Sequence, residues 1–177
     1  MIEPKLIHAI IEGYTLPPMG IHGLPHWARV FENGLKLASQ TGAKEQVVAF
    51  FAVFHDSRRR NEEVDPGHGA RGGTLASQLR AQYLNLADDE FELLVYACAH
   101  HTDGTVDGDV TVQTCWDADR LDLPRVGITP MNERLCTSAA KNEEIQAWSR
   151  ERSISDYTPD YVVKDWQRGT EHHCVGR

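Results

Sequence analysis

The sequence predicts an all-α fold, and three observations support that prediction. Apolar residues recur at helical spacing along most of the chain, and no stretch shows the strict alternation that marks a half-buried strand. The run VVAFFAVF, at 47–54, is apolar on nearly all sides, as expected of the central helix of a bundle. A length of 177 residues is enough for one domain with its own core. We therefore expect a compact helical bundle that forms a single domain over 1–177.

The first three helices are defined by prolines and by the apolar run. In TLPPMGIHGLP, the prolines restrict the backbone on both sides of His22, so this stretch is expected to be a loop. Pro25 suits the first turn of the helix that follows. The third helix contains the apolar run and ends in a His and an Asp. These helices are expected at about 3–13, 25–39 and 43–56.

Four further helices follow, separated by polar segments. SRRRNEEVDPGHG reads as a charged loop, and DGTVDGD as a turn-rich loop with two D-G pairs. Asp88 is expected to cap a helix whose apolar stripe includes Phe91, Leu94 and Cys98. Thr137 is expected to cap the last well-defined helix. These helices are expected at about 68–84, 88–101, 110–123 and 139–152.

Composition excludes several kinds of partner. The formal charge of −8 argues against a nucleic-acid polymer, because such binding needs a basic face. The four cysteines form no C-x-x-C pair, which argues against a zinc ribbon or a thioredoxin-like motif. No apolar run is long enough to cross a bilayer, and the first residues lack the layout of a signal peptide. We expect a soluble cytoplasmic protein that binds no membrane.

A set of His and Asp residues lies at the ends or starts of the expected helices. Taken singly, each His is more often a surface or hydrogen-bonded core residue than a ligand. Together, imidazole nitrogen and carboxylate oxygen suit Fe, Mn, Co, Ni or Zn, and a carboxylate can bridge two such ions. Adjacent helical residues point about 100° apart, so a His-Asp pair can flank a metal at a helix edge while other helices supply further ligands. The candidates are His26, His55, Asp56, His68, His100, His101 and Asp119.

Three short motifs carry a family resemblance. HWARV at 26–30, HD at 55–56 and ADRL at 118–121 resemble, in the same order, the H…HD…D signature of the HD-domain superfamily of metal-dependent phosphohydrolases. The resemblance spans about 21–126 and implies an HD-type bundle, with C-terminal helices over about 130–170. The four core metal ligands that it implies are His26, His55, Asp56 and Asp119.

Two other segments resemble the two-metal branch of this superfamily. HGARGG, from His68, is similar to the segment that brings a third His. HHTDG, from His100, is similar to both the H-H pair of HD-GYP proteins and the H-T-x-G of a bacterial dinucleotide tetraphosphate hydrolase family. The G-Y-P element is missing, which argues against cyclic-di-GMP hydrolysis. The resemblance implies that His68 and at least one of His100 and His101 hold a second metal. We expect one or two divalent ions per chain, Fe or Mn before Ni, Co, Zn or Mg.

Residues on the substrate side are predicted from spacing and charge. His22 precedes His26 by four residues, which resembles the H-N-x-x-H motif of cyclic-nucleotide phosphodiesterases and implies a proton donor or phosphate ligand. A solvated loop His is the alternative. Arg59 stands where many HD proteins have the Lys of H-D-x-x-K, and a guanidinium binds phosphate oxygens in a fork. Arg58 and Arg59 are therefore candidate substrate ligands, with a solvated charged face as the alternative.

Other polar and aromatic residues near the motifs are interpreted as structural. Trp27 and Trp116 are expected to pack in the core. Arg29 and Arg120 are expected to pair with buried carboxylates near them. The alternative for the two Trp residues is that they form a wall of the pocket.

The resemblance implies hydrolysis of a phosphoester or phosphoanhydride of a small metabolite, above all a nucleotide. Metal-activated water would be the nucleophile, with Asp56 and His22 in the catalytic machinery. Some HD-type proteins, such as myo-inositol oxygenase, instead use six His and Asp ligands around two irons to activate O₂, and this is the first alternative. The second is a non-catalytic module that binds a nucleotide or a structural metal, against which the apparently full ligand set argues. The expected partner is a small phosphorylated substrate.

Overall fold

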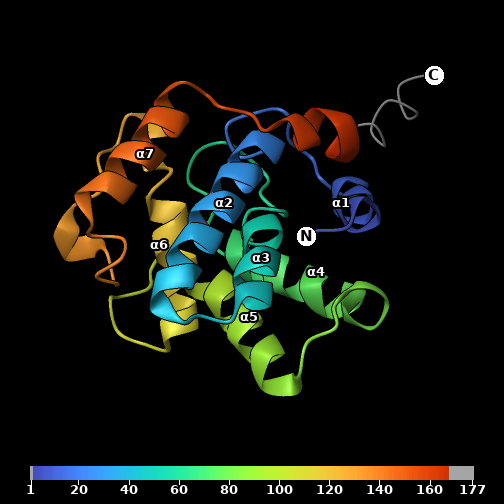
Figure 1. The fold of residues 1–177 in the computed structure, drawn as a ribbon. Coiled ribbons are helices and arrows are strands. Elements are labelled where there is room, and N and C mark those ends of the chain that lie inside the picture. The colour runs from blue at the N-terminus through green and yellow to red at the C-terminus, as the bar shows by residue number, and fades with distance from the viewer. Residues whose placement is uncertain (1, 168–177) are drawn as a thin grey trace.

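The protein is built from helices packed around a central pair. In this computed structural model, which describes residues 2–167, helices α2 (Leu24–Thr41) and α3 (Glu45–Phe54) lie side by side, and α6 (Val110–Arg120) packs against both (Figure 1). The described residues contain no strand, so the all-α prediction is confirmed. The other elements are α1 (Pro4–Ile11), α4 (His68–Tyr83), α5 (Asp88–His100), η1 (Leu123–Val126), η2 (Asn132–Arg134), α7 (Glu143–Ile154) and η3 (Val162–Trp166).

Helix α3 is the centre of the core, as its composition predicts. It contacts α2, α4, α5 and α6, which bury most of its apolar side chains and leave Ala49 and Phe50 partly exposed. Phe51 and Phe54 are fully buried, and burying a side chain of this size contributes about 1.5–3 kcal/mol. The N–H of His55 still donates to the Phe51 carbonyl at 3.0 Å, which continues the helical turn by one residue. His55 and Asp56 are therefore delivered at the point where α3 ends inside the molecule.

Helix α4 meets its neighbours through main-chain atoms. A Cβ added at Gly69 would lie 2.0 Å from the Cys98 carbonyl oxygen, at the end of α5. A Cβ at Gly72 would lie 2.1 Å from the Phe54 carbonyl oxygen, at the end of α3. Such distances leave no room for a side chain, so glycine is required at both positions. This close approach places His68, the first residue of α4, beside the ends of α3 and α5.

Two of the predicted helix caps are wrong. Asp88 is the first residue of α5 rather than its N-cap, although its charge still favours that helix end. The cap of α7 is Asn142, whose side chain accepts the N–H of Glu144 at 2.9 Å. Thr137 does not cap α7. Its hydroxyl instead donates a hydrogen bond to the Asp117 carboxylate at 2.8 Å. Both helices nevertheless form close to the expected ranges.

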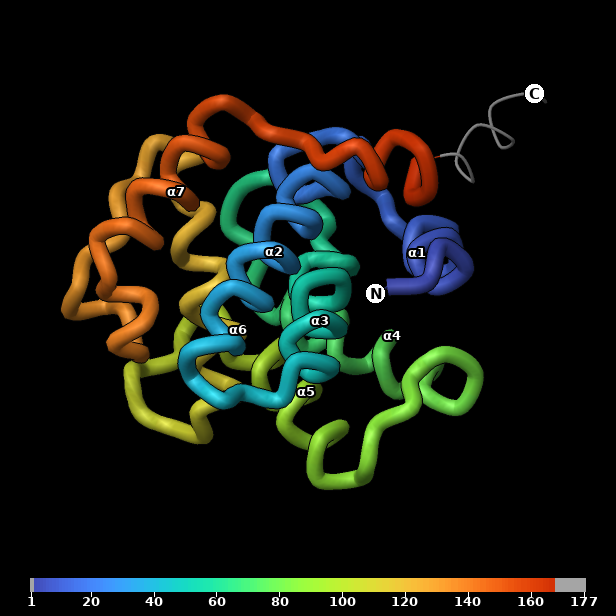
Figure 2. Tube along the Cα trace, viewed as in Figure 1, coloured from blue at the N-terminus to red at the C-terminus, as the bar shows by residue number. Residues whose placement is uncertain are grey.

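The ends of the described chain lie together on one side of the bundle. Helix α1 contacts the π-helical turn η3 near the last described residue (Figure 2). Of the helices expected over about 130–170, α7 and η3 are found, and positions 168–170 lie outside the described residues. Across 2–167, no helix is both long and apolar enough to cross a bilayer.

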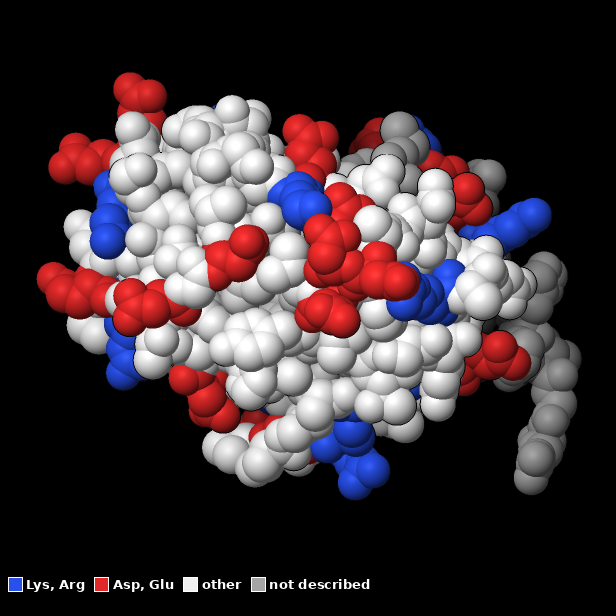
Figure 3. All heavy atoms as spheres, turned by 90° about the horizontal axis from the view of Figure 1, so that it is seen from below, with Lys and Arg blue, Asp and Glu red and all other residues white. Residues whose placement is uncertain are grey.

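The surface reflects the acidic composition. On the face drawn in Figure 3, Asp and Glu side chains gather near the middle and Lys and Arg side chains are scattered among them. A formal charge of −8 agrees with this view. Such a face does not attract a polyanion.

Candidate metal centre

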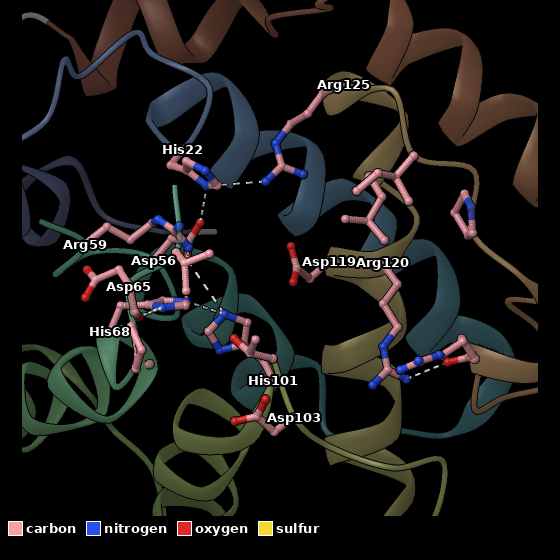
Figure 4. Close-up of a pocket in the computed structure, with 18 of the residues that line it drawn as sticks. His22, Asp56, Arg59, Asp65, His68, His101, Asp103, Asp119, Arg120 and Arg125 are labelled. Carbon is pink, nitrogen blue, oxygen red and sulfur yellow. Dashed lines mark hydrogen bonds and ion pairs between the residues drawn. The ribbon is translucent and has the colours of Figure 1, made fainter. Parts of the chain in front are cut away.

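Most of the predicted metal ligands converge at the base of one cavity of about 760 Å³. Figure 4 shows Asp56, His68, His101 and Asp119 turned toward the same space, with His22 and Arg125 at its edge. His26 and His55 lie fully buried beneath them. The converging side chains, which come from α2, the ends of α3 and α5, the start of α4 and α6, are His26, His55, Asp56, His68, His101 and Asp119.

One group of four donor atoms has the spacing of ligands around a single ion. We call it site A: Nε2 of His26, Nε2 of His55, Oδ1 of Asp119 and Oδ2 of Asp56. The two Nε2 atoms are 3.1 Å apart, and Asp119 Oδ1 lies 3.4 Å and 3.6 Å from them. Asp56 Oδ2 lies 3.6 Å from His26 Nε2 and 3.8 Å from His55 Nε2. Donors held about 2.1 Å from one ion are separated by about 3–3.5 Å, so these atoms are close to a coordinating arrangement.

A second group shares Asp56 and faces the cavity. We call it site B: Oδ1 of Asp56, Nε2 of His68 and Nε2 of His101. The two Nε2 atoms are 2.8 Å apart, and Asp56 Oδ1 lies 3.1 Å from the first and 3.7 Å from the second. Asp56 Oδ1 is buried and accepts no hydrogen bond from the described residues. One oxygen of Asp56 thus faces each site, which is the arrangement of a bridging carboxylate.

The four imidazole rings are oriented from behind by oxygen acceptors. In each ring Nδ1 faces an acceptor, which places its proton there and turns the Nε2 lone pair into the cluster. The four Nδ1–H groups donate from His26 to Asp122 Oδ2 (2.8 Å), from His55 to the Ala52 carbonyl (3.1 Å), from His68 to the Asp65 carbonyl (2.7 Å) and from His101 to the Cys98 carbonyl (2.8 Å). Two pairs of Nε2 lone pairs then face each other, and a cation between them would relieve their repulsion.

Charges within the cluster also favour a cation. Burial, followed by the charge of Arg125, lowers the pKa of His26 to about 4, so this ring is neutral near pH 7. Burial acts to raise the pKa of Asp56 and Asp119, but the surrounding histidines outweigh it and hold both well below the usual range. Burial acts to lower the pKa of His101, but Asp56 and Asp119 outweigh it and raise that pKa. Two ionised carboxylates thus share a buried space, where a proton on His101 competes with a metal ion.

Asp122 has a role that the motifs do not indicate. It is fully buried, accepts from His26 Nδ1, and also accepts from Arg29 Nε at 2.8 Å. The expected ion pair of Arg29 with a buried carboxylate is therefore found. The corresponding expectation for Arg120 is wrong, because its guanidinium donates to two backbone carbonyls, at 2.6 Å and 2.8 Å. The spacing in the sequence could have indicated this role for Asp122. It follows Asp119 by three residues, and residues three apart in a helical turn lie close together.

His22 is part of the site rather than a solvated loop residue. Its Nδ1 donates to Asp56 Oδ2 at 2.8 Å, and the side chain is largely buried. The Tyr14 hydroxyl donates to the His22 carbonyl at 2.9 Å and so fixes the loop. Arg125 Nη2 lies 3.4 Å from the same ring nitrogen. His22 therefore stands between the metal-binding atoms and the cavity wall.

Two predicted site residues do not reach the cavity, and both are corrections. Arg58 turns toward α1, where it donates to the Ile10 carbonyl at 2.9 Å. His100 is exposed, with its ring 4.5 Å from that of Tyr96. Neighbouring residues in a helical turn point about 100° apart, so only one of His100 and His101 can face the cluster. That residue is His101.

The cavity wall opposite α4 contains residues that no motif predicted. Arg125, in η1, donates to the Ile21 carbonyl at 2.9 Å and to the Asp122 carbonyl at 3.0 Å, which holds its guanidinium near His22 (Figure 4). Ile128 and Met131 line the same wall, with 53% and 58% of their surfaces exposed. The wall combines a fixed positive charge with exposed aliphatic surface.

Comparison with protein-family models, with curated proteins and with solved structures finds no match to this chain. The site is therefore defined by its own geometry. The chain is an all-helical protein with a buried His and Asp cluster, spaced for metal binding, beneath a cavity. The fold and this cluster define the class of protein, and the reaction that the site would carry out is proposed below.

Proposed function

We propose that the protein is a metal-dependent phosphohydrolase of HD-domain type. Its substrate would be a phosphoester or phosphoanhydride of a small metabolite, above all a nucleotide. The observation that carries the proposal is the position of Asp56 between two groups of donor atoms at the base of a cavity. Its Oδ2 atom faces site A and its Oδ1 atom faces site B. The resemblance of the HWARV, HD and ADRL motifs to the HD-domain signature supports the same reading.

The donor atoms fit divalent transition metals. Site A offers two nitrogens and two oxygens, and site B two nitrogens and one oxygen, a mixture that suits Fe, Mn, Co, Ni or Zn. Mg²⁺ prefers oxygen ligands, so four imidazoles make it the least suited of the candidates. The unpartnered Asp56 Oδ1 and the facing Nε2 pairs are the features that a bound cation would satisfy. When bound, the ions would supply an activated water nucleophile and positive charge against the phosphoryl oxygens.

The protein's own residues would bind and orient the phosphate. Arg125 presents a buried guanidinium at the cavity edge, and guanidinium groups bind phosphate oxygens in a fork. His22 lies between Arg125 and Asp56 and carries a proton on Nδ1. Because Nδ1 donates to Asp56, the group that would protonate a leaving oxygen is the second ring nitrogen, Nε2, of a doubly protonated His22 at the cavity wall, and in this role His22 would act as the general acid.

The cavity sets the size of the substrate. A volume of about 760 Å³ is within the range of about 300–1,000 Å³ found for small-molecule sites. Ile128 and Met131 offer aliphatic surface to the part of the substrate that is not phosphate. The net charge of −8 adds a general barrier to polymeric nucleic acids.

The test combines metal analysis with a phosphate-release assay. Protein purified without chelator is analysed for transition metals and then assayed anaerobically with nucleotides and other phosphoesters. We expect at least one ion per chain as purified, close to two after metal is added, and phosphate release that Asp56→Ala abolishes. His100→Ala, which replaces an exposed neighbour of the cluster, is the matched control and retains both. Phosphate release that survives in Asp56→Ala would refute the proposal.

The di-iron oxygenase remains the second candidate because the six-ligand set is complete. Its ligands would be those of sites A and B. Among the described residues, two of the four arginines that line the cavity, Arg59 and Arg125, lie beside the donor atoms or His22 and favour the hydrolase, because they suit a phosphate better than a neutral polyol. Oxygen uptake by the iron-loaded protein, without phosphate release, would reverse this order. Tight nucleotide binding without turnover, across several metals, would favour the non-catalytic module.

A further inference from the structure

A built-in cation is in direct contact with the donor atoms of site B, whereas the arginines near site A, Arg29 and Arg125, contact Asp122 and His22 instead of its donor atoms. Arg59 Nη1 is 3.3 Å from His68 Nε2 and 3.5 Å from Asp56 Oδ1, two of the three donor atoms of site B. In site A, the ion-pair partners of Asp119 among the described residues are histidines alone. The two sites therefore differ in whether a cation is in direct contact with the atoms that would bind a metal ion.

The guanidinium of Arg59 is held in this position by the loop that follows it. Its Nε donates to the Asn61 carbonyl at 3.3 Å and its Nη2 to the Glu63 carbonyl at 2.5 Å. The side chain is 9% exposed, so it is not free to turn into solvent. Figure 4 shows it beside Asp56 and above His68. The contact with site B is thus a feature of the folded loop.

The contact uses the electron pairs that a metal would use. His68 Nδ1 donates to the Asp65 carbonyl, so its Nε2 has a lone pair to offer, and Arg59 Nη1 donates a hydrogen bond to it. Arg59 satisfies Asp56 Oδ1 only in part, because the 3.5 Å contact is an ion pair without a hydrogen bond. The Arg59 guanidinium therefore binds only weakly at site B. A divalent ion can displace it, but the hydrogen bond to His68 and the ion pair with Asp56 are then lost.

We propose that Arg59 competes with the second metal ion for site B. The inference rests on the metal centre of the proposed function. Site A then fills first, and site B fills only at a higher metal concentration. Like charges a few ångströms apart in a buried site repel strongly, and this repulsion falls with distance, so Arg59 weakens the second binding step more than the first. Arg59 in this way sets whether the protein carries one ion or two.

The experiment is a metal titration with three variants of the full chain. Protein stripped with chelator is titrated with Mn²⁺ by calorimetry, and the bound metal is counted by elemental analysis. Arg59→Gln removes the charge and keeps hydrogen-bond donors, Arg59→Lys keeps the charge, and Arg60→Gln alters the exposed neighbouring arginine as the matched control. We expect the wild type to bind in two steps, with Arg59→Gln tightening the second by about tenfold or more and the first by a smaller factor. Arg59→Lys should stay near the wild type, and Arg60→Gln should match it.

The outcomes separate this inference from the proposed function. A second step that is unchanged or weakened in Arg59→Gln overturns the competition, since Arg59 would then be inert or would support site B. Wild-type protein that binds no Mn²⁺ in either step overturns the proposed metal centre and the inference together. Thermal melts check that each variant folds, and Arg59→Met, which also removes the charge, carries the same expectation where Arg59→Gln is unstable.

Discussion

Sites A and B share Asp56 but are built differently. Site A belongs to the core helices α2, α3 and α6, contains a second carboxylate, Asp119, and has His26 backed by the Asp122 carboxylate. Site B lies toward α4 and α5, has both imidazoles backed by backbone carbonyls, and has the Arg59 guanidinium beside it. If the proposed metal centre is correct, site A would hold an ion firmly and site B would hold one conditionally.

The largest effect is expected from removing what the two halves share. Asp56→Asn leaves the volume almost unchanged but removes the charge that faces both sites. We expect loss of both ions and a fall in turnover of about a thousandfold or more. Elemental analysis and phosphate release measure this, with circular dichroism to confirm the fold. Retention of two ions would mean that Asp56 does not bridge.

The next prediction separates the halves directly. His26→Ala should abolish binding at site A, and it should also destabilise the fold by about 2–4 kcal/mol, because a buried ring is lost and Asp122 loses a donor. His68→Ala should abolish the second binding step alone and leave one ion per chain. Metal stoichiometry and urea unfolding check both. Equal losses in the two variants would show that the sites cannot fill independently.

Metal removal tests whether the ions also support the fold. At a metal concentration 100 times its Kd, a bound ion stabilises the folded state by about 2.7 kcal/mol. For a chain of this length, that raises Tm by about 5–10 °C. Thermal melts with and without chelator measure the difference. A Tm that metal does not change would contradict binding within the core.

A smaller effect is expected from the residue that orients a ligand in site A only. Asp122→Asn keeps the shape but weakens the hold on His26 Nδ1. Changes of this kind cost about 10–100-fold in metal affinity. We therefore expect the first Mn²⁺ step to weaken by that amount and the second to change little. Equal weakening of both steps would indicate a general disturbance of the bundle.

The smallest effect is expected at His100. Its ring is exposed and lies outside both sites, so His100→Ala should leave Mn²⁺ affinity within about twofold and stability within about 0.5 kcal/mol. The Mn²⁺ titration and urea unfolding measure both quantities. Loss of the second ion in this variant would place His100, rather than His101, in site B.

The sequence predicted those parts of the site that local patterns determine. The apolar run of α3 requires burial on all sides, and a His-Asp pair at its end can only emerge inside the molecule. His26, His55, Asp56 and Asp119 each occur in a short motif whose position on a helix follows from periodicity. The fold class could therefore be predicted from periodicity, and the convergence of these four side chains from the resemblance of their motifs to the HD-domain signature.

The remainder depends on how elements turn relative to one another. The rotation of α5 about its axis determines that His101, and not His100, faces the cluster. The turn after α3 determines that Arg59 reaches the cavity while Arg58 points toward α1. Arg125 lies in a segment without helical periodicity, so no pattern associates it with the cavity. These features are set by packing between distant segments, which neighbouring residues do not encode.

The two glycines of α4 that touch the ends of α3 and α5 have a consequence for the choice of ion. A side chain can rotate to absorb a small shift, whereas main chains in contact cannot. The distance from His68 to Asp56 and His101 is therefore fixed by backbone contact. Preferred metal–ligand distances differ between ions by only a few tenths of an ångström. A methyl group at Gly72 would lie 2.1 Å from the Phe54 carbonyl oxygen, so Gly72→Ala would force α4 away from the end of α3 and move His68 away from Asp56.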